Sequence, residues 1–157
     1  MFQINDYVVY KNDVCIIESI KDVNDKKYYV LIPVSDNTLK INVPIDSTIV
    51  KAIMSKEDAL RIVDLIKDVP LIDIKNERTL EQEYKSMIAS GDYKDLISII
   101  KTAYLRNEKR KDEKKKIGEI DEKYFNFAEK KLYNELSLAL NMSMPELKEF
   151  IFNKIND

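Results

Sequence analysis

The sequence of residues 27–44 is KYYVLIPVSDNTLKINVP, two short apolar runs separated by a polar turn. In the second run, residues 39–43, apolar residues alternate with the polar Lys40 and Asn42. This period of two is typical of a half-buried β-strand. Pro44 is expected to end the strand, because proline has no N–H group to donate to a ladder. The stretch therefore predicts two neighbouring strands of an antiparallel sheet.

Three further runs of the same kind surround this pair. All are rich in Val, Ile and Tyr, polar turns separate them, and together the five runs cover residues 6–10, 14–20, 27–34, 39–43 and 49–53. Five strands of this length are too few for a two-sheet sandwich, and they predict a small SH3-like or Tudor-like β-barrel.

From Met54 onward the apolar residues recur with the period of helices. Five helices are predicted: one ending before Pro70, one over residues 79–90, one containing residues 96–105, and two over residues 120–140 and 145–155. The predicted fold class is therefore α+β, with a β-barrel domain over residues 1–53 and a bundle of about five helices over residues 54–157.

Three helix ends have local signals of their own. Thr79 begins a pattern that resembles a capping box, in which a hydroxyl and a later Glu or Gln satisfy the first N–H groups. Gly91 is predicted to end the same helix in the left-handed conformation, and Asp92 to cap the next helix.

The composition excludes several classes of function. The chain has no histidine and one cysteine, so a His-based triad, a zinc site and an intrachain disulfide are excluded. Its two glycines lie far apart, which excludes a P-loop and a dinucleotide-binding fingerprint. No run is apolar enough to span a membrane. We expect a cytoplasmic protein that is not an enzyme and that has no metal, no cofactor, no membrane partner and no small-molecule substrate.

The remaining candidates for catalysis have simpler explanations. Cys15 lies in an apolar strand with no basic neighbour, so we expect a buried, unreactive thiol. The adjacent carboxylate pairs are expected to be surface charges. Tyrosines of the strands could stack on bases or line a groove, but the alternation assigns at least half of them to the barrel core.

The positive charge is concentrated in one segment. Residues 75–116 contain 12 basic and 8 acidic side chains, whereas residues 117–157 contain 5 and 8. The densest part is the run Arg106–Lys116. Such a run is commonly a solvated helix end whose lysines favour the helix dipole. The alternative interpretation is a surface that contacts the phosphate backbone of a nucleic acid.

The order of the motifs resembles a known family. In the N-terminal half the matching stretches are Ile4–Tyr10, Tyr28–Leu31 and Val43-Pro44. In the helical half they are Glu83–Lys85, Ala89–Asp92, Ile99–Lys101, Leu105-Arg106 and Ala128–Ala139. Both halves are similar to the CarD/CdnL family of bacterial transcription regulators, whose N-terminal domain is also found in transcription-repair coupling factors.

The resemblance implies a transcription regulator with two partners. The barrel would bind the β subunit of RNA polymerase by edge-strand pairing, with Lys40, Ile41 and Asn42 as the contacts. The helical domain would bind double-stranded promoter DNA and modulate the stability of the open complex. The DNA contacts would be Arg78, Lys85, Lys94, Lys101 and Arg106.

Independently of the resemblance, a short alternating strand that ends in proline suits β-augmentation, and Ile41→Pro is expected to disrupt it. The alternative is that this strand is internal to the sheet.

Two departures from the family pattern affect these expectations. Asn42 replaces a basic residue typical of the docking strand, so weaker charge pairing with polymerase is expected. Many members have a tryptophan wedge before the second helix, but this chain has no tryptophan, and Glu77 lies in the matching segment. Wedge insertion into DNA is therefore not expected. The competing interpretation of the whole chain is an adaptor that binds only proteins.

Overall fold

The computed structural model describes residues 1–11 and 13–156. The chain divides into two compact units, Met1–Ser55 and Lys56–Asp157. Each unit has its own core.

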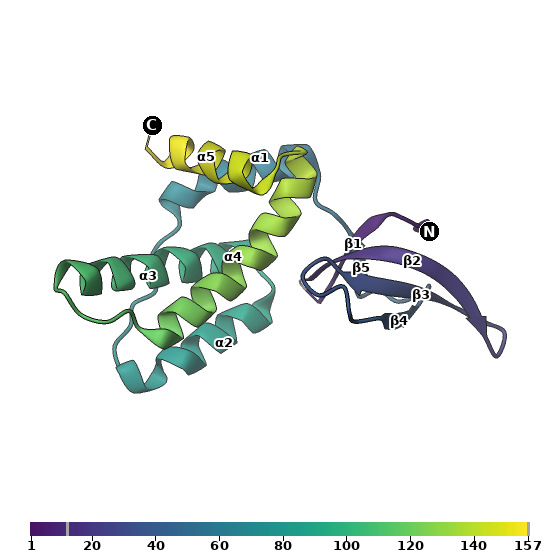
Figure 1. The fold of residues 1–157 in the computed structure, drawn as a ribbon, viewed down its shortest axis with the longest axis horizontal. Helices are drawn as coiled ribbons and strands as arrows, with labels where there is room; N and C mark the ends of the chain where they lie inside the picture. The colour runs from purple at the N-terminus through teal and green to yellow at the C-terminus, as the bar shows by residue number, and fades with distance from the viewer. Residues whose placement is uncertain (12, 157) are drawn as a thin grey trace. The chain divides into compact units, whose positions relative to one another are not determined.

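The N-terminal unit is a five-stranded antiparallel sheet (Figure 1). Its strands are β1 (Tyr7–Tyr10), β2 (Asp13–Val23), β3 (Lys26–Pro33), β4 (Ile41–Pro44) and β5 (Val50–Ala52). The order β4-β3-β2-β1-β5 leaves β4 and β5 as the two edge strands. With the five helices that follow, this sheet confirms the predicted α+β fold class.

The fourth strand differs from the prediction at its start. It begins at Ile41 instead of Leu39, because Asp36 holds the preceding residues in a turn. The Asp36 carboxylate accepts from the Thr38 N–H at 3.1 Å, and its carbonyl accepts from the Leu39 N–H at 3.3 Å.

The core of this unit is built from the inward-facing residues of all five strands. It contains Val8, Cys15, Ile17, Tyr29, Leu31, Val43 and Val50. Ile41 and Val43 of β4 face this core, as the alternation of residues 39–43 predicts, and they pair with Leu31 and Tyr29 of β3. The pairing of β2 with β3 shifts register between Ile17 and Ser19. Cys15 is completely buried, which confirms its assignment to packing.

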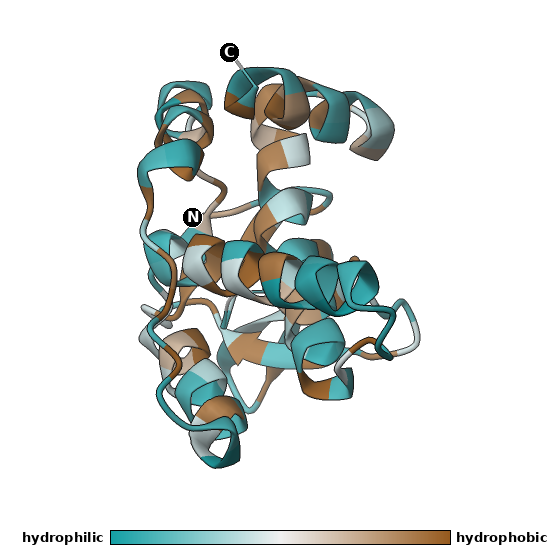
Figure 2. Ribbon diagram, turned by 90° about the vertical axis from the view of Figure 1, so that its left-hand side faces the viewer, coloured by the Kyte–Doolittle hydropathy of each residue, from teal (hydrophilic) through white to brown (hydrophobic). Residues whose placement is uncertain are grey.

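The helical unit has five α-helices and two short 3-10 helices (Figure 1). They are α1 (Lys56–Leu65), η1 (Ile66–Asp68), η2 (Glu77–Thr79), α2 (Leu80–Ser90), α3 (Tyr93–Asp112), α4 (Glu119–Leu140) and α5 (Met144–Ile155). Helix α4 packs against α1, α2, α3 and α5. The helices are amphipathic, with hydrophobic and hydrophilic residues alternating around them (Figure 2). Helix α3 is longer than the predicted third helix, which was placed on residues 96–105, and it includes much of the basic run.

The helix ends confirm some signals and correct others. Gly91 has a φ of 71°, and the Asp92 side chain accepts from the Lys94 N–H, as predicted. The capping box predicted at Thr79 is wrong: the Thr79 side chain makes no capping bond, because Asn76 caps η2 before it. A capping box is instead formed by Ser143 with Glu146, at the start of α5.

Candidate functional site

Strand β4 has one hydrogen-bonding edge that no strand of the described sheet occupies. The Ile45 N–H donates to the carbonyl of Lys27 in β3 at 3.2 Å, so the backbone groups of Ile45 point toward β3. In an antiparallel ladder the inward and outward positions alternate, and the register pairs Ile41 with Leu31 and Asn42 with Val30. Ile41 and Val43 therefore direct their backbone groups toward β3, and Asn42 and Pro44 direct theirs outward.

This geometry corrects the expected effect of Ile41→Pro. The Ile41 N–H belongs to the internal ladder, so proline there would disturb the sheet itself. The outward donor of β4 is the Asn42 N–H, and the outward acceptor is the Asn42 carbonyl. The Pro44 carbonyl already accepts from the Ser47 N–H at 3.0 Å. The alternative of an internal fourth strand is wrong, because β4 is at the edge of the sheet.

The side chains of the three expected contacts have different surroundings. Lys40 Nζ forms an ion pair with Glu18 Oε1 at 3.0 Å, and both side chains are exposed. Ile41 is half-buried and packs against the core, whereas Asn42 is exposed. Lys40 and Asn42 are therefore accessible to a partner, and Ile41 positions the strand.

Lys101, one of the five expected DNA contacts, is occupied within the helical unit. Its Nζ donates to the carbonyl oxygens of Ile66, Lys67 and Val69, at 2.8, 3.2 and 2.6 Å. These carbonyls lie at the end of η1, where helical carbonyls have no helical partner of their own. The ammonium group therefore acts as a cap that ties η1 to α3.

Arg106, another expected DNA contact, lies between two carboxylates. Its Nε donates to both oxygens of Asp121, at 3.2 and 3.1 Å, and its Nη2 donates to both oxygens of Glu77, at 2.5 and 2.6 Å. Burial opposes the charged form, but the hydrogen bond with Glu77 and the charge of Asp121 raise the pKa of Arg106 above its ordinary value. Both sides of the Arg106 guanidinium are thus hydrogen-bonded to carboxylates of the protein itself.

The centre of this cluster is Asp121, whose side chain is completely buried. It also accepts from Arg110 Nη1 at 2.6 Å and from the Tyr84 hydroxyl at 2.6 Å. Burial, followed by the hydrogen bond to Asp121, raises the pKa of Tyr84 well above its ordinary value, so this hydroxyl stays a donor. Gly118 permits the arrangement, because a Cβ at this position would overlap the Arg110 guanidinium.

The other three expected DNA contacts are accessible. Arg78, Lys85 and Lys94 are exposed, and their side chains form no ion pair within residues 1–11 and 13–156. They lie before, within and just after α2, an 11-residue helix about 16 Å long.

The basic run is partly neutralised by its own neighbours. Lys111 pairs with Glu108 at 3.3 Å, and Lys115 pairs with Glu113 at 3.0 Å. Lys109, Arg110 and Lys111 form the last turn of α3, where positive charge favours the helix dipole. This placement matches the solvated helix end described above.

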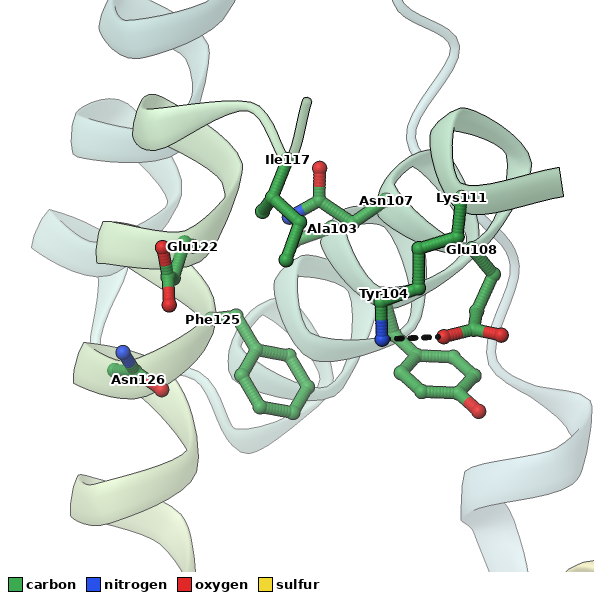
Figure 3. Close-up of a pocket in the computed structure, with 9 residues that line it drawn as sticks. All are labelled: Ala103, Tyr104, Asn107, Glu108, Lys111, Ile117, Glu122, Phe125 and Asn126. Atoms are coloured by element: carbon green, nitrogen blue, oxygen red, sulfur yellow. Dashed lines mark hydrogen bonds and ion pairs between the residues drawn. The ribbon is translucent and has the colours of Figure 1, made fainter. Parts of the chain in front are cut away.

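Two surface hollows contain exposed aromatic rings. In the hollow between α3 and α4, the rings of Tyr104 and Phe125 have centroids 6.4 Å apart (Figure 3). The second hollow lies between α2 and α4 and includes Lys85, Lys123 and Phe127. Sequence reasoning missed Lys123 and Phe127, because residues 117–157 are acidic as a whole and the pairing of α2 with α4 is a tertiary feature.

No helix in residues 1–11 and 13–156 is both long and apolar enough to cross a membrane.

Comparison with known protein families gives a match for the N-terminal unit. Residues 2–56 match the family model of the CarD-like/TRCF RID domain, and no curated protein matches the chain. This match indicates an RNA polymerase-interacting, transcription-related protein. The matched residues correspond to the N-terminal unit with its exposed β4 edge, and this unit is similar to the CarD-like/TRCF RID domain.

Proposed function

We propose that this protein is a cytoplasmic transcription regulator, and not an enzyme, that binds the RNA polymerase β subunit through β4 and promoter DNA through its helical unit. Its effect would be on the stability of the open promoter complex. The observation that carries the polymerase half is the exposed edge of β4 within a CarD-like/TRCF RID domain. A partner strand would pair with the outward N–H and carbonyl of Asn42, and Lys40 would lie beside it.

The test of the polymerase half is a pull-down of core polymerase with full-length variants. Asn42→Pro removes the outward N–H, and proline is tolerated in an edge strand when the missing donor faces solvent. We expect a folded protein that no longer retains polymerase.

A matched control exists on the opposite edge of the sheet. Lys51 pairs with Val9, and its backbone N–H and carbonyl point toward β1. Because these directions alternate along a strand, the N–H of the neighbouring Ala52 points outward from β5. Ala52→Pro should retain polymerase. Loss of binding in Ala52→Pro together with full binding by Asn42→Pro would place the docking edge on β5 and contradict the proposal.

The DNA half of the proposal is supported by the accessible cations of the helical unit. We rest it on Arg78, Lys85 and Lys94, because the structure gives Lys101 and Arg106 internal partners. Since no set of side chains suited to reading base edges is apparent, binding should consist of phosphate contacts and tolerate any sequence.

The test of the DNA half is the salt dependence of duplex binding. Each cation that neutralises a phosphate contributes roughly −0.9 to the slope of log K against log salt. Replacing Arg78, Lys85 and Lys94 together by Ala should therefore flatten the slope by up to about 2.7. The absence of salt-dependent binding in the unmodified protein would leave the protein-only adaptor as the better description.

A further inference from the structure

Arg78, one of the three accessible cations, lies in a very short helical turn. Helix η2 consists of Glu77, Arg78 and Thr79, and it follows Asn76, whose backbone is extended, with φ −147° and ψ 121°. A turn of this length is not stable by itself, because the cost of fixing the first helical residues is recovered only in longer helices. Contacts with other residues must therefore hold Arg78 in its place.

Asn76 provides the local contacts. Its side-chain Oδ1 accepts from the Arg78 N–H at 2.9 Å. Its carbonyl accepts from the N–H and the hydroxyl of Thr79, at 3.1 and 3.0 Å. These hydrogen bonds fix the shape of the turn, but all of them lie within four consecutive residues. They do not determine where the turn lies against the helices of the unit.

Glu77 connects the turn to α3. The Nη2 group of Arg106 donates to both oxygens of the Glu77 carboxylate, at 2.5 and 2.6 Å. The Glu77 side chain is 68% exposed, whereas that of Arg106 is only 21% exposed. An ion pair between two exposed side chains contributes little, because both must be ordered to form it. Here the guanidinium is already ordered, so only Glu77 loses freedom when the pair forms.

Arg106 is ordered by a buried carboxylate. Its Nε donates to both oxygens of Asp121, whose side chain is completely buried. Asp121, on α4, also accepts from Tyr84 of α2 and from Arg110 of α3, each at 2.6 Å. The hydrogen bonds of one carboxylate thus join three helices, and Glu77 connects η2 to this junction through Arg106.

We propose that Glu77 and Arg106 are positioning residues for Arg78, which hold η2 against α3 so that the Arg78 guanidinium meets a DNA phosphate on an already ordered turn. Groups that are held in place before binding avoid the loss of affinity that ordering would cause. The inference rests on the proposed function, in which Arg78 is a phosphate contact. It gives Arg106 an indirect part in DNA binding in place of the direct contact expected from the sequence.

The competing interpretation is that Glu77 opposes DNA binding. Its carboxylate is next to Arg78 in the sequence and would repel a phosphate, and it occupies a guanidinium that could otherwise bind one. However, Glu77, Arg106, Arg110 and Asp121 together carry no net charge, so the cluster as a whole exerts little force on a phosphate. This neutrality favours positioning over repulsion.

The two interpretations predict opposite effects of Glu77→Ala on duplex binding, measured with the full chain by fluorescence anisotropy. Positioning predicts binding weaker by about fivefold, the factor that corresponds to ordering the backbone of one residue during binding. The slope of log K against log salt should not change, because Arg78 still contacts its phosphate in the complex. Repulsion predicts tighter binding and, through the released Arg106, a slope steeper by roughly 0.9.

Two further variants separate the charge of Glu77 from its hydrogen bonds. Glu77→Gln removes the charge but keeps an oxygen that accepts from Arg106, so its affinity should lie between those of the unmodified protein and Glu77→Ala. Asp73→Ala is the matched control. Asp73 is an exposed carboxylate of the same connection and has no hydrogen bond or ion pair within residues 1–11 and 13–156. Its replacement should not weaken binding.

A double-mutant cycle distinguishes positioning of Arg78 from a general structural role. In a protein that already has Arg78→Ala, adding Glu77→Ala should have no further effect on duplex binding, because there is no guanidinium left to position. If Glu77 merely stabilised the whole unit, its loss would also impair Lys85 and Lys94. Glu77→Ala would then weaken binding equally with and without Arg78.

Hydrogen exchange of the free protein gives a readout that does not require DNA. The N–H groups of Arg78, Thr79 and Leu80 are all hydrogen-bonded within η2 or to its cap. In Glu77→Ala these amides should exchange about fivefold faster, because the same local opening limits exchange and binding. The amides of α5 should keep their rates.

Three results would overturn the inference: tighter duplex binding by Glu77→Ala, an equal loss of affinity in the Arg78→Ala background, or unchanged exchange at residues 78–80. Each of them leaves the proposed function intact if the unmodified protein binds duplex DNA in a salt-dependent way. An unmodified protein without such binding would instead refute the DNA half of the proposed function, and the positioning role with it.

Discussion

Replacing Lys101 by Met would test whether this side chain is a structural cap or a DNA contact. Methionine keeps most of the aliphatic stem but removes the ammonium group. The carbonyls of Ile66, Lys67 and Val69 would then lose the donor that reaches all three. Two of these residues, Ile66 and Val69, are buried, so water could replace the donor only in part.

The expected loss of stability follows from these contacts. A hydrogen bond to a charged group contributes about 1.5–3 kcal/mol, and the bonds to Ile66 and Val69 are the shorter and more buried ones. Allowing for partial solvation of the freed carbonyls, we expect Lys101→Met to lower the free energy of unfolding by about 2–4 kcal/mol. For a chain of this size, that corresponds to a decrease in Tm of roughly 4–15 °C.

The assay is urea unfolding of the full chain, followed by far-UV circular dichroism, which reports mainly on the helical unit. Lys94→Met is the matched control, because Lys94 lies on the same helix and is exposed. A surface substitution of this kind should change the stability by no more than about 0.5 kcal/mol. Duplex binding of both variants, measured below their unfolding transitions, completes the comparison.

The two roles give opposite patterns. A cap predicts that Lys101→Met is destabilised and keeps its salt slope, whereas Lys94→Met is stable and has a flatter slope. A Lys101→Met protein as stable as the unmodified one, with a slope flatter by about 0.9, would refute the assignment.

Three further predictions concern the helical unit. Asp121→Asn should lower the free energy of unfolding in urea by about 3–5 kcal/mol, because it leaves the guanidinium groups of Arg106 and Arg110 without their buried counter-charge. Gly118→Ala should cost about 2 kcal/mol in the same assay, because its Cβ would displace Arg110 from Asp121, and a change below about 0.5 kcal/mol would contradict this. Ser143→Ala should cost about 1 kcal/mol as the loss of an N-cap. Because the hydrogen bonds of Ser143 lower the pKa of Glu146, their stabilisation is present above the ordinary Glu pKa and should disappear in urea titrations as the pH falls through the lowered value.

The sequence alone was sufficient for the sheet, because alternation reports directly on burial. In β4, Val43 is buried, Ile41 is half-buried and the intervening Asn42 is exposed, as the alternation of residues 39–43 predicts. Alternation of side chains does not reveal which backbone groups face the neighbouring strand, since that depends on the register with β3. This is why Ile41→Pro looked like a test of docking and Asn42→Pro is the correct one.

The candidate DNA contacts could be predicted only in part, for a related reason. Lys85 and Lys101 have the same side chain and similar helical neighbourhoods in the sequence. The structure distinguishes them because Lys101 meets carbonyls more than 30 residues earlier in the chain, and Arg106 meets Asp121 across the α3/α4 pair. No local pattern encodes such a partner. The capping box at Ser143 and Glu146 could have been found, because both residues lie within one helical turn.

Counting charge by segment is misleading for the same physical reason. The excess of residues 75–116 includes Arg106 and Arg110, and both are held by Asp121, which belongs to the acidic segment 117–157. That acidic segment in turn supplies Lys123, which lines the hollow beside Lys85 and forms an ion pair with Glu81 of α2. A polyanion responds to the field that the packed helices produce, and carboxylates brought in from other segments change this field. The helical packing therefore leaves Arg78, Lys85 and Lys94, and not the basic run of α3, as the accessible cations on which the proposed DNA contact rests.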